Sequence, residues 1–473
     1  MGADSRTQTA IPPVDFHSSW PLVMNKRSFI KLFSGMLAGP AVSPLLALLP
    51  DSKLKNWAGN VEYGTENLYT VNSLEQARDF VRKQSRLKVL GTRHCFNKIA
   101  DSTNQFLSLK PADELVAINS EARTATVDGS MTYGHLCPLL HEKGFALHNL
   151  ASLPHISIAG SCSTGTHGSG DKNRNLATAV SALEMITASG DLIQLSRQKD
   201  GDKFSGAVVG LGALGVITKV TLDIQPAYTM KQYVYLDMPL DQVKEHFDAI
   251  SSSAYSVSLF TDWRNKNVNE VWIKSRVEEG KAFAPSSEFL GAKAATRNFH
   301  PIAALAAENC TEQMGVPGPW YERLPHFRMG FTPSAGKELQ SEYFVPRRHA
   351  VEAILAVERL HGQVSPQLLI TEIRTIAADD LWMSPCYKQP SVTIHFTWKQ
   401  DWPAIRKLLP IIEKELLPFK PRPHWGKLFT IPPAELKSAY EKLPEFIELS
   451  KTYDPSGKFR NPFLNTNIFG DRA

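Results

Sequence analysis

Cysteine is scarce in this chain of 473 residues, which contains five cysteines and no CxxC pair. An odd number of scattered cysteines argues against a complete disulfide framework, and their spacing does not supply a set of metal ligands. We therefore predict no metal site. Most of the cysteines are expected to be small buried residues.

The chain also lacks a strong excess of one charge. It has 52 basic and 47 acidic residues, a formal net charge of +5, and no stretch in which the basic residues gather. Nucleic acid is therefore not a predicted partner. The composition, 42% hydrophobic and 21% charged, is that of a globular protein long enough to bury two or three cores.

Long apolar runs are missing beyond residue 50. Before that point, the sequence from Met24 places basic residues ahead of an apolar stretch at 32–49, the layout of a signal peptide. Its KRSFIK segment resembles a twin-arginine export signal with Lys in place of the first Arg. We predict that residues 1–54 are a leader, that Met24 is the true start and that the protein is exported to the periplasm. A membrane anchor is the alternative, although the run is short for a span; no other membrane insertion is predicted.

A helix is missing where a dinucleotide-binding fingerprint would require one. Gly210, Gly212 and Gly215 spell GxGxxG, but the following VITKVTLDI alternates as a strand does. The fingerprint needs a helix whose N-terminus faces the pyrophosphate. We therefore predict a tight turn here and no Rossmann site.

Short strands, helices and Gly-rich loops alternate in the first half of the chain. Ser73 and Gln76 form a capping box for a helix, and Thr132 caps a second helix that ends at Gly144. Strands are expected at residues 87–90, 122–127, 180–188, 192–195 and 216–224. This half is predicted to be mixed α and β.

Two segments of the first half carry candidate functional residues. The first is GTRHCFN at residues 91–97, where His94 follows a predicted buried strand. The second is ASLPHISIAGSCSTGTHGSG at residues 151–170, in which glycines and hydroxyl side chains allow close approach of a diphosphate to the backbone amides. A flexible linker is the alternative, but the interleaved apolar residues argue against it.

Two strands further on carry polar residues at alternate positions. Glu372 and Arg374 in QLLITEIRTIA are two residues apart and share one face of a strand. His395 and Thr397 alternate with apolar residues in SVTIHFTW. The pattern predicts that these four side chains line one cavity; an exposed sheet face with a surface ion pair is the alternative.

Together these segments resemble the alditol oxidases of the vanillyl-alcohol oxidase superfamily, from residue 56 to residue 469. The resemblance includes AYSVSLFTDW, NCTEQMGVPGPWYERLPHFR at residues 309–328, ELQSEY, TEIRTIAAD and RPHWGK. It implies an α+β fold of two domains: a PCMH-type FAD-binding domain at residues 55–228 and a cap at 229–415, built on an antiparallel sheet with flanking helices. Residues 416–473 are expected to return to the FAD-binding domain. Pro410 and Pro418 argue against a simple continuous helix before that segment.

The resemblance implies that FAD is bound covalently, through its ring methyl group, to His94. Arg93 and Cys95 depart from the usual GSGHS form of this loop, and Cys95 is expected to be a packing residue. Leu153 stands where some relatives carry a second, cysteine link, so a single attachment is expected. The other residues that the resemblance implies for FAD are Gly91, Thr92, Arg93, Cys95, Ser152, Ser157, Gly160, Ser161, Cys162, Ser163, Thr164, Gly165, Thr166, His167, Gly168, Ile217, Thr397 and His424.

The resemblance also implies a substrate and a reaction. A sugar alcohol of the xylitol or sorbitol type would be oxidised at its terminal hydroxyl to the aldose, and O2 would be reduced to H2O2. Substrate contacts are implied for Ser152, Glu372, Arg374, Thr397 and Lys427, and catalytic roles for Lys427, Arg374, Glu372 and His395. Such residues suit an uncharged polyol, whose selection requires paired donors and acceptors.

Several alternatives stay open at this point. The substrate can be a sugar-1,4-lactone, and the electron acceptor can be a quinone or a cytochrome. A noncatalytic sugar-binding protein with the same fold is a third possibility. We expect a monomer.

Overall fold

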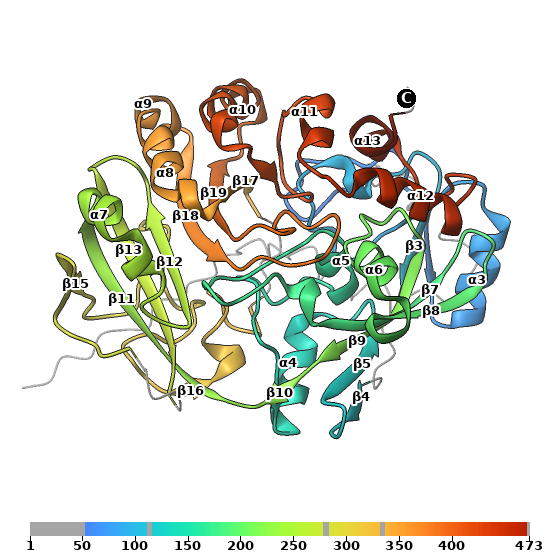
Figure 1. The fold of residues 1–473 in the computed structure, drawn as a ribbon, viewed down its shortest axis with the longest axis horizontal. Helices are drawn as coiled ribbons and strands as arrows, with labels where there is room; N and C mark the ends of the chain where they lie inside the picture. The colour runs from blue at the N-terminus through green and yellow to red at the C-terminus, as the bar shows by residue number, and fades with distance from the viewer. Residues whose placement is uncertain (1–52, 111–115, 278–282, 332–335, 471–473) are drawn as a thin grey trace, which may run out of the picture. The chain divides into compact units, whose positions relative to one another are not determined.

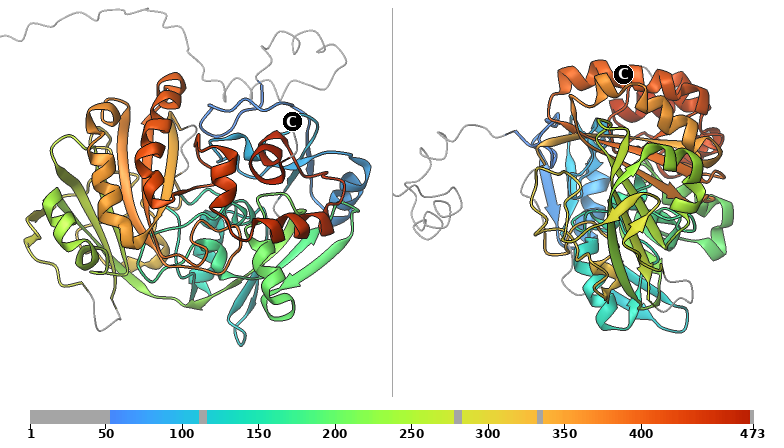
Figure 2. Two further views of the ribbon diagram at one scale, coloured as in Figure 1. Left: turned by 45° about the horizontal axis from the view of Figure 1, so that its top comes forward. Right: turned by 90° about the vertical axis from the view of Figure 1, so that its left-hand side faces the viewer.

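The computed structural model describes residues 53–110, 116–277, 283–331 and 336–470, which Figure 1 and Figure 2 draw in colour. The predicted leader, including Met24, lies outside the described residues up to residue 52. Across the described ranges, no helix combines the length and the apolar character needed to cross a membrane.

The first half of the described chain builds small sheets with short helices around them. A parallel sheet has the order β1-β3-β2, and an antiparallel sheet has the order β4-β5-β9-β7-β8. Their strands are β1 (Leu68–Val71), β2 (Lys88–Val89), β3 (Phe106–Leu109), β4 (Val116–Asn119), β5 (Thr124–Asp128), β7 (Val180–Ile186), β8 (Leu192–Ser196) and β9 (Val216–Asp223). A further pair joins β6 (Phe145–Ala146) to β10 (Gln225–Pro226). The helices are α3 (Leu74–Lys83), α4 (Tyr133–Glu142), α5 (Ile158–Ser163) and α6 (Arg197–Val208).

The local signals read from the sequence form the structures that they predict. The Ser73 hydroxyl accepts from the Gln76 N–H at the start of α3, and Thr132 does the same for His135 at the start of α4. Gly144 ends α4 at a φ of 82°, which favours glycine. After Gly215 the chain enters β9, so the rejection of a Rossmann site is confirmed.

One large antiparallel sheet dominates the second half. Among the described residues its order is β14-β15-β11-β13-β12-β18-β19-β17-β20, with β16 beside β11. Its strands are β11 (Thr229–Pro239), β12 (Ser256–Thr261), β13 (Asn267–Arg276), β14 (Glu288–Phe289), β15 (Ala292–Ala294), β16 (Gly318–Pro319), β17 (Glu338–Pro346), β18 (Leu368–Ile376), β19 (Ser391–Lys399) and β20 (Arg422–Pro423). The helices of this region are α7 (Leu240–Ser251), α8 (Ala350–Glu358), α9 (His361–Val364) and α10 (Trp402–Leu416), and they lie along the sheet in Figure 1.

Both faces of the central strands are covered. Helix α8 packs on β17 and β19, and successive side chains of β18 and β19, which point to opposite faces of the sheet, are buried apart from Leu369 and Lys399. Glu372 and Arg374 are only 4% and 5% exposed. The alternative of a solvated sheet face with a surface ion pair is therefore wrong.

The prediction that proline breaks the helical stretch is also wrong for Pro410. Helix α10 continues through Pro410 from Trp402 to Leu416. The proline removes one backbone hydrogen bond, but a row of apolar side chains on this helix is fully buried and holds it together. That row is Ile405, Leu409, Ile412 and Leu416. Pro418 lies beyond α10, in the short 3₁₀ turn Leu417–Phe419.

The C-terminal segment contacts both halves. It begins with β20, which pairs with β17, and continues through α11 (Pro433–Ser438), α12 (Leu443–Tyr453) and α13 (Pro462–Leu464). The Lys458 ammonium then donates to the carbonyls of Val81 and Ala188, both at 2.6 Å. The Asn461 amide donates to three carbonyls between Lys98 and Asp101.

Candidate active site

A cavity of about 280 Å³ runs between the Gly-rich segments and the large sheet. One wall comes from the loop after β2, the segment around α5 and the turn between α6 and β9. The opposite end is closed by β17, β18, β19 and the chain after β20. These seven parts of the sequence therefore meet at one site.

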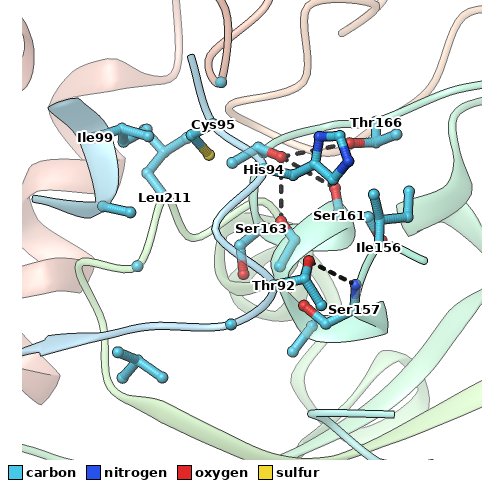
Figure 3. Close-up of a pocket in the computed structure, with 18 of the residues that line it drawn as sticks. Thr92, His94, Cys95, Ile99, Ile156, Ser157, Ser161, Ser163, Thr166 and Leu211 are labelled. Carbon is cyan, nitrogen blue, oxygen red and sulfur yellow. Dashed lines mark hydrogen bonds between the residues drawn. The ribbon is translucent and has the colours of Figure 1, made fainter. Parts of the chain in front are cut away.

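Small residues give the first wall its shape. A Cβ added to Gly91 or to Gly160 would come within 2.8 or 2.7 Å of the Ser157 hydroxyl, so a larger residue at either position would displace the Ser157 side chain. Figure 3 shows Thr92 beside Ser157, where the Ser157 N–H donates to the Thr92 hydroxyl at 3.4 Å. Backbone amides and hydroxyl groups of this kind fit a diphosphate.

His94 lies on the same wall (Figure 3). Its ring stacks on Trp57 with 4.4 Å between centroids, and its Nε2 contacts Nε2 of His155. Burial, together with His155, lowers the pKa of His94 to about 3. The ring is therefore neutral and keeps a nitrogen lone pair, as a nucleophile requires.

The two departures in this loop have different consequences. Arg93 adopts a φ of 62°, a left-handed conformation that a glycine would adopt without strain. Cys95 lines the cavity and packs against the main hydrophobic core. Burial raises the pKa of the Cys95 thiol to about 11, so it stays protonated.

A buried carboxylate organises the other end of the cavity. Glu342 on β17 accepts from Lys427 Nζ at 2.7 Å and from Arg374 Nη2 at 2.7 Å, and its Oε1 lies 3.1 Å from His167 Nε2. Burial alone would raise the pKa of Glu342, but Lys427, His167 and Arg374 hold it well below its usual range. We refer to Glu342, Arg374, Lys427 and Glu372 as the ionic cluster.

Glu342 is not among the predicted site residues, although the sequence contains a signal for it. ELQSEY alternates polar residues, and in the sheet Glu342 pairs with His395, which in turn pairs with Glu372. This cross-strand row requires the pairing of β17 with β19, which the sequence alone does not give.

The prediction that four side chains line one cavity holds for two of them. Arg374 and His395 are on the wall, whereas Glu372 and Thr397 are not. The Glu372 carboxylate is drawn behind the wall by His326, whose Nε2 lies 2.7 Å from Oε1. Thr397 pairs with Gln340 across β17 and β19, and Gln340 is the member of this pair that reaches the cavity.

His395 presents an unused nitrogen to this site. Its Nε2 is buried and makes no hydrogen bond within the described part of the chain, while its Nδ1 lies 3.8 Å from Glu372 Oε2. Burial and then Lys427 lower the pKa of His395 to about 4, so the ring is neutral. An unpartnered buried nitrogen on a cavity wall fits a site that receives a ligand.

Most of the residues predicted to contact the cofactor line the cavity. They are Gly91, Thr92, Arg93, His94, Cys95, Ser152, Ser157, Gly160, Ser161, Ser163, Thr164, Thr166, His167, Ile217 and His424. Besides Thr397, three residues do not. Cys162 faces the Tyr133 hydroxyl, Gly165 packs against Pro385, and Gly168 packs against Leu150.

Lys88 is a cavity residue that the sequence did not reveal. Its Nζ donates to the carbonyls of Gly212 at 2.8 Å and Phe459 at 3.1 Å. Burial lowers the pKa of Lys88 to about 7. A lysine within a short apolar strand carries no pattern that would indicate its orientation.

Comparison with known proteins identifies the family. A family model described as an FAD binding domain matches residues 69–196, and one described as D-arabinono-1,4-lactone oxidase matches residues 333–467. An alditol oxidase from a Streptomyces species is 43% identical over 419 residues, which are 88% of this chain and 99% of the relative. The chain belongs to the alditol oxidase family. Its cofactor is FAD, as predicted.

More distant relatives define the surrounding group. L-gulonolactone oxidase from Bos taurus is 24% identical and matches 87% of this chain and 97% of its own. L-gulono-1,4-lactone dehydrogenase from Mycobacterium tuberculosis is also 24% identical, over 86% of this chain and 97% of its own. A solved structure of a solvent-stable cholesterol oxidase superposes with a TM-score of 0.69 at 14% identity, covering 88% of this chain and 97% of that one. The predicted α+β fold with a PCMH-type FAD-binding domain is confirmed.

Proposed function

We propose that the protein is an FAD-dependent oxidase that converts the terminal hydroxyl of a sugar alcohol to the aldose, with O2 reduced to H2O2. Its 43% identity to an alditol oxidase over nearly the whole of that relative supports the substrate class. The observation that carries the chemistry is the ionic cluster, which presents Lys427 and Arg374 to one end of the FAD cavity.

When bound, FAD would supply the acceptor for the hydride that leaves the substrate carbon. The protein prepares the hydroxyl for this loss: Lys427 and Arg374 donate to its oxygen and stabilise the negative charge that develops there. His395 accepts the hydroxyl proton on Nε2, which is neutral and unpartnered among the described residues. The imidazolium formed would lie near the Glu372 carboxylate.

The remaining hydroxyls of the substrate give the site its selectivity. Ser152 accepts hydrogen bonds, and Arg374 donates them. A compound that lacks one of these hydroxyls leaves a buried polar group unpaired, which disfavours its binding.

His94 is the proposed covalent anchor of FAD. Its neutral ring lies on the wall with the glycine and hydroxyl groups that suit the diphosphate. Ala151 also lines the cavity, and we place it near the flavin face that O2 reaches, as the resemblance to alditol oxidases implies.

A second candidate function is oxidation of a sugar-1,4-lactone. It is favoured by the family model for residues 333–467, which is described as a D-arabinono-1,4-lactone oxidase. A quinone or cytochrome is the corresponding alternative to O2.

The purified protein would be mixed anaerobically with xylitol, sorbitol and a sugar-1,4-lactone in turn, and bleaching of the flavin absorbance recorded. O2 would then be admitted and peroxide measured. We expect bleaching by the polyols and one peroxide per flavin reoxidised. Bleaching by the lactone alone would refute the alditol assignment, and reoxidation by a quinone but not by O2 would indicate a dehydrogenase.

The remaining features of the proposal concern organisation and location. Residues 55–228 bind FAD, residues 229–415 cap the flavin, and residues 416–473 return to the FAD-binding domain. The KRSFIK segment directs export of the protein to the periplasm. The protein is a monomer. Cell fractionation with and without a Lys26→Gln and Arg27→Gln change tests the export signal.

A further inference from the structure

Lys88 is a buried cation on the wall of the cavity, and the reaction proposed above gives it no role. It begins strand β2, just before the loop that carries His94, and is only 2% exposed. Its Nζ donates to the carbonyls of Gly212 at 2.8 Å and Phe459 at 3.1 Å. Within the described ranges Lys88 forms no ion pair with a carboxylate.

The hydrogen bonds and the charge of Lys88 are only partly compensated. An ammonium has three N–H donors, and the two carbonyls accept from two of them. Burial lowers the pKa of Lys88 to about 7, because a charge that is removed from water without an anionic partner is costly. A ligand that brings an anionic oxygen to this wall would supply both the missing acceptor and the missing negative charge.

The titratable groups around Lys88 do not supply that anion. Burial raises the pKa of the Cys95 thiol to about 11, so it stays neutral. The Asp454 carboxylate raises the pKa of Lys88, but it accepts from the backbone N–H groups of Lys458 at 2.7 Å and Phe459 at 2.8 Å. Asp454 is therefore already engaged by the backbone of its own turn.

The contacts of Lys88 connect it to the segment that suits a diphosphate. Next to Gly212, the Leu211 N–H donates to the carbonyl of Ser163, the last residue of α5, at 3.0 Å. A Cβ added to Gly212 would lie 3.2 Å from Lys88 Nζ, so glycine lets the ammonium approach this turn closely. All four residues line the cavity, and Leu211 and Ser163 are labelled in Figure 3.

The other cations that line the cavity are engaged elsewhere. Lys427 and Arg374 bind Glu342 at the opposite end. Arg93 directs Nη1 to the Lys55 carbonyl at 3.4 Å. Among the described residues of the cavity, Lys88 is thus the buried cation that lies on the wall of glycines and hydroxyl groups without an acidic partner.

We propose that Lys88 is an FAD-binding residue whose third N–H donates to an oxygen of the FAD diphosphate. The proposal rests on the assignment of this cavity to FAD, and it is independent of the substrate that is oxidised. A bound diphosphate would raise the pKa of Lys88. Above pH 7, FAD would therefore bind together with a proton.

The test uses the full chain with His94→Ala, so that FAD can dissociate, and compares Lys88→Met with Lys458→Met. Lys458 is the matched control: it is also buried and donates to two carbonyls, those of Val81 and Ala188, but it does not line the cavity. The Kd of FAD is measured from the fluorescence of released FAD on dilution, between pH 6 and pH 9. ADP and adenosine are measured as competitors, because only ADP carries the diphosphate.

Loss of a charged hydrogen bond predicts that Lys88→Met raises the Kd of FAD and of ADP about 10- to 100-fold at pH 6. The Kd of adenosine is expected to change less than about twofold, and Lys458→Met to raise the Kd of FAD less than about threefold. With Lys88 present, the Kd of FAD should rise by up to about tenfold per pH unit above pH 7, as the ammonium loses its proton. In Lys88→Met this pH dependence should disappear. Tm serves as the folding control.

A second variant covers the case in which Lys88→Met does not fold. Lys88→Arg keeps a charge that is not lost below pH 9, so its Kd for FAD should stay constant where that of the Lys88 protein rises. Titration of FAD itself is common to all variants and cancels in this comparison. An identical pH dependence in the Lys88 and Lys88→Arg proteins would overturn the proposal.

Two other results would also overturn it. One is a Lys88→Met protein that binds FAD as tightly as Lys458→Met does. The other is an equal loss of affinity for ADP and adenosine, which would show that Lys88 only maintains the shape of the site. A wild-type protein that carries no FAD and a His94→Ala protein that binds none would refute the assignment of the cavity to FAD, and the role of Lys88 with it.

Discussion

Replacement of Glu342 by glutamine tests whether this carboxylate organises the active site. The change keeps the shape of the side chain and removes its charge. Lys427 and Arg374, both 2.7 Å from the carboxylate, would then share a buried site without this shared anion. Glu372 would remain to balance only one of the two cations.

The magnitude follows from the burial of these groups. Removal of one partner from a buried ion pair costs about 3 to 5 kcal/mol, because the other charges stay buried without compensation. With an unfolding entropy of about 2.1 cal/mol/K per residue over roughly 420 residues, this loss corresponds to a decrease in Tm of about 3 to 6 °C.

The same change alters the pH dependence of flavin reduction. Burial lowers the pKa of Lys427, and Glu342 is the largest influence that opposes this lowering. Without Glu342 the pKa of Lys427 falls further, and the charged form is lost at a lower pH. We expect the alkaline limb of the bleaching rate to move down by about 1 to 3 pH units.

The assay is thermal unfolding at pH 6, together with stopped-flow bleaching by xylitol from pH 5 to 10. Glu338→Gln is the control: it makes the same chemical change on the same strand, where Glu338 contacts Gln340 and forms no ion pair among the described residues. This control should change stability by less than about 1 kcal/mol. A Glu342→Gln variant that matches Glu338→Gln in both Tm and pH profile would refute the reasoning.

Four further predictions concern separate parts of the molecule. His94→Ala should release all of its FAD on acid denaturation, whereas wild-type protein should keep it in the precipitate. Lys427→Ala should lower flavin reduction by alditol at least about 100-fold in stopped flow but leave FAD content unchanged. Arg93→Gly should raise the stability measured in urea by up to about 1 kcal/mol and Arg93→Val lower it by about as much, because φ is positive there. Burial raises the pKa of Glu270 to about 7, so the proton that stabilises the folded state is fully bound below about pH 4.5 and is lost as the pH rises through 7. Glu270→Gln carries no such proton, so its free energy of unfolding should rise by roughly 3 kcal/mol relative to that of the wild type between pH 5 and pH 8, measured by urea unfolding.

Short-range patterns in the sequence were sufficient for much of the fold. The caps at Ser73 and Thr132 and the strand after Gly215 depend on residues within one or two turns of each other. Helix α10 is the counterexample: the local effect of Pro410 was read correctly, but burial of one apolar face outweighs a single missing hydrogen bond.

Site residues could be predicted where a motif or an alternating pattern within one strand marks them. They could not be predicted where the pairing of distant strands brings them to the site. Arg374 and His395 emerge from alternation within single strands. Glu342 acquires its role from β19 beside it and from Lys427, 85 residues further along the chain. Glu372 lies on the predicted face of its strand, but its carboxylate does not line the cavity because it is hydrogen-bonded to His326. His326 belongs to a segment without a regular pattern, so no sequence pattern indicates this contact.

In the ionic cluster the negative and positive groups lie at different depths. This arrangement explains how a site whose charges balance can stabilise negative charge on the substrate oxygen. Glu342 has no exposed side-chain surface, whereas the side chain of Lys427 is 14% exposed. The two carboxylates thus lie deeper than the ammonium, and the surrounding histidines His395 and His424 have pKa values lowered by burial and by Lys427. The histidines therefore add no positive charge that the substrate would have to displace. The positive end of a fixed dipole faces the cavity before substrate arrives, and no reorganisation is needed when negative charge develops on the hydroxyl oxygen. On this argument Glu342 serves catalysis by holding the cations in place, since a lone buried lysine would lose its proton.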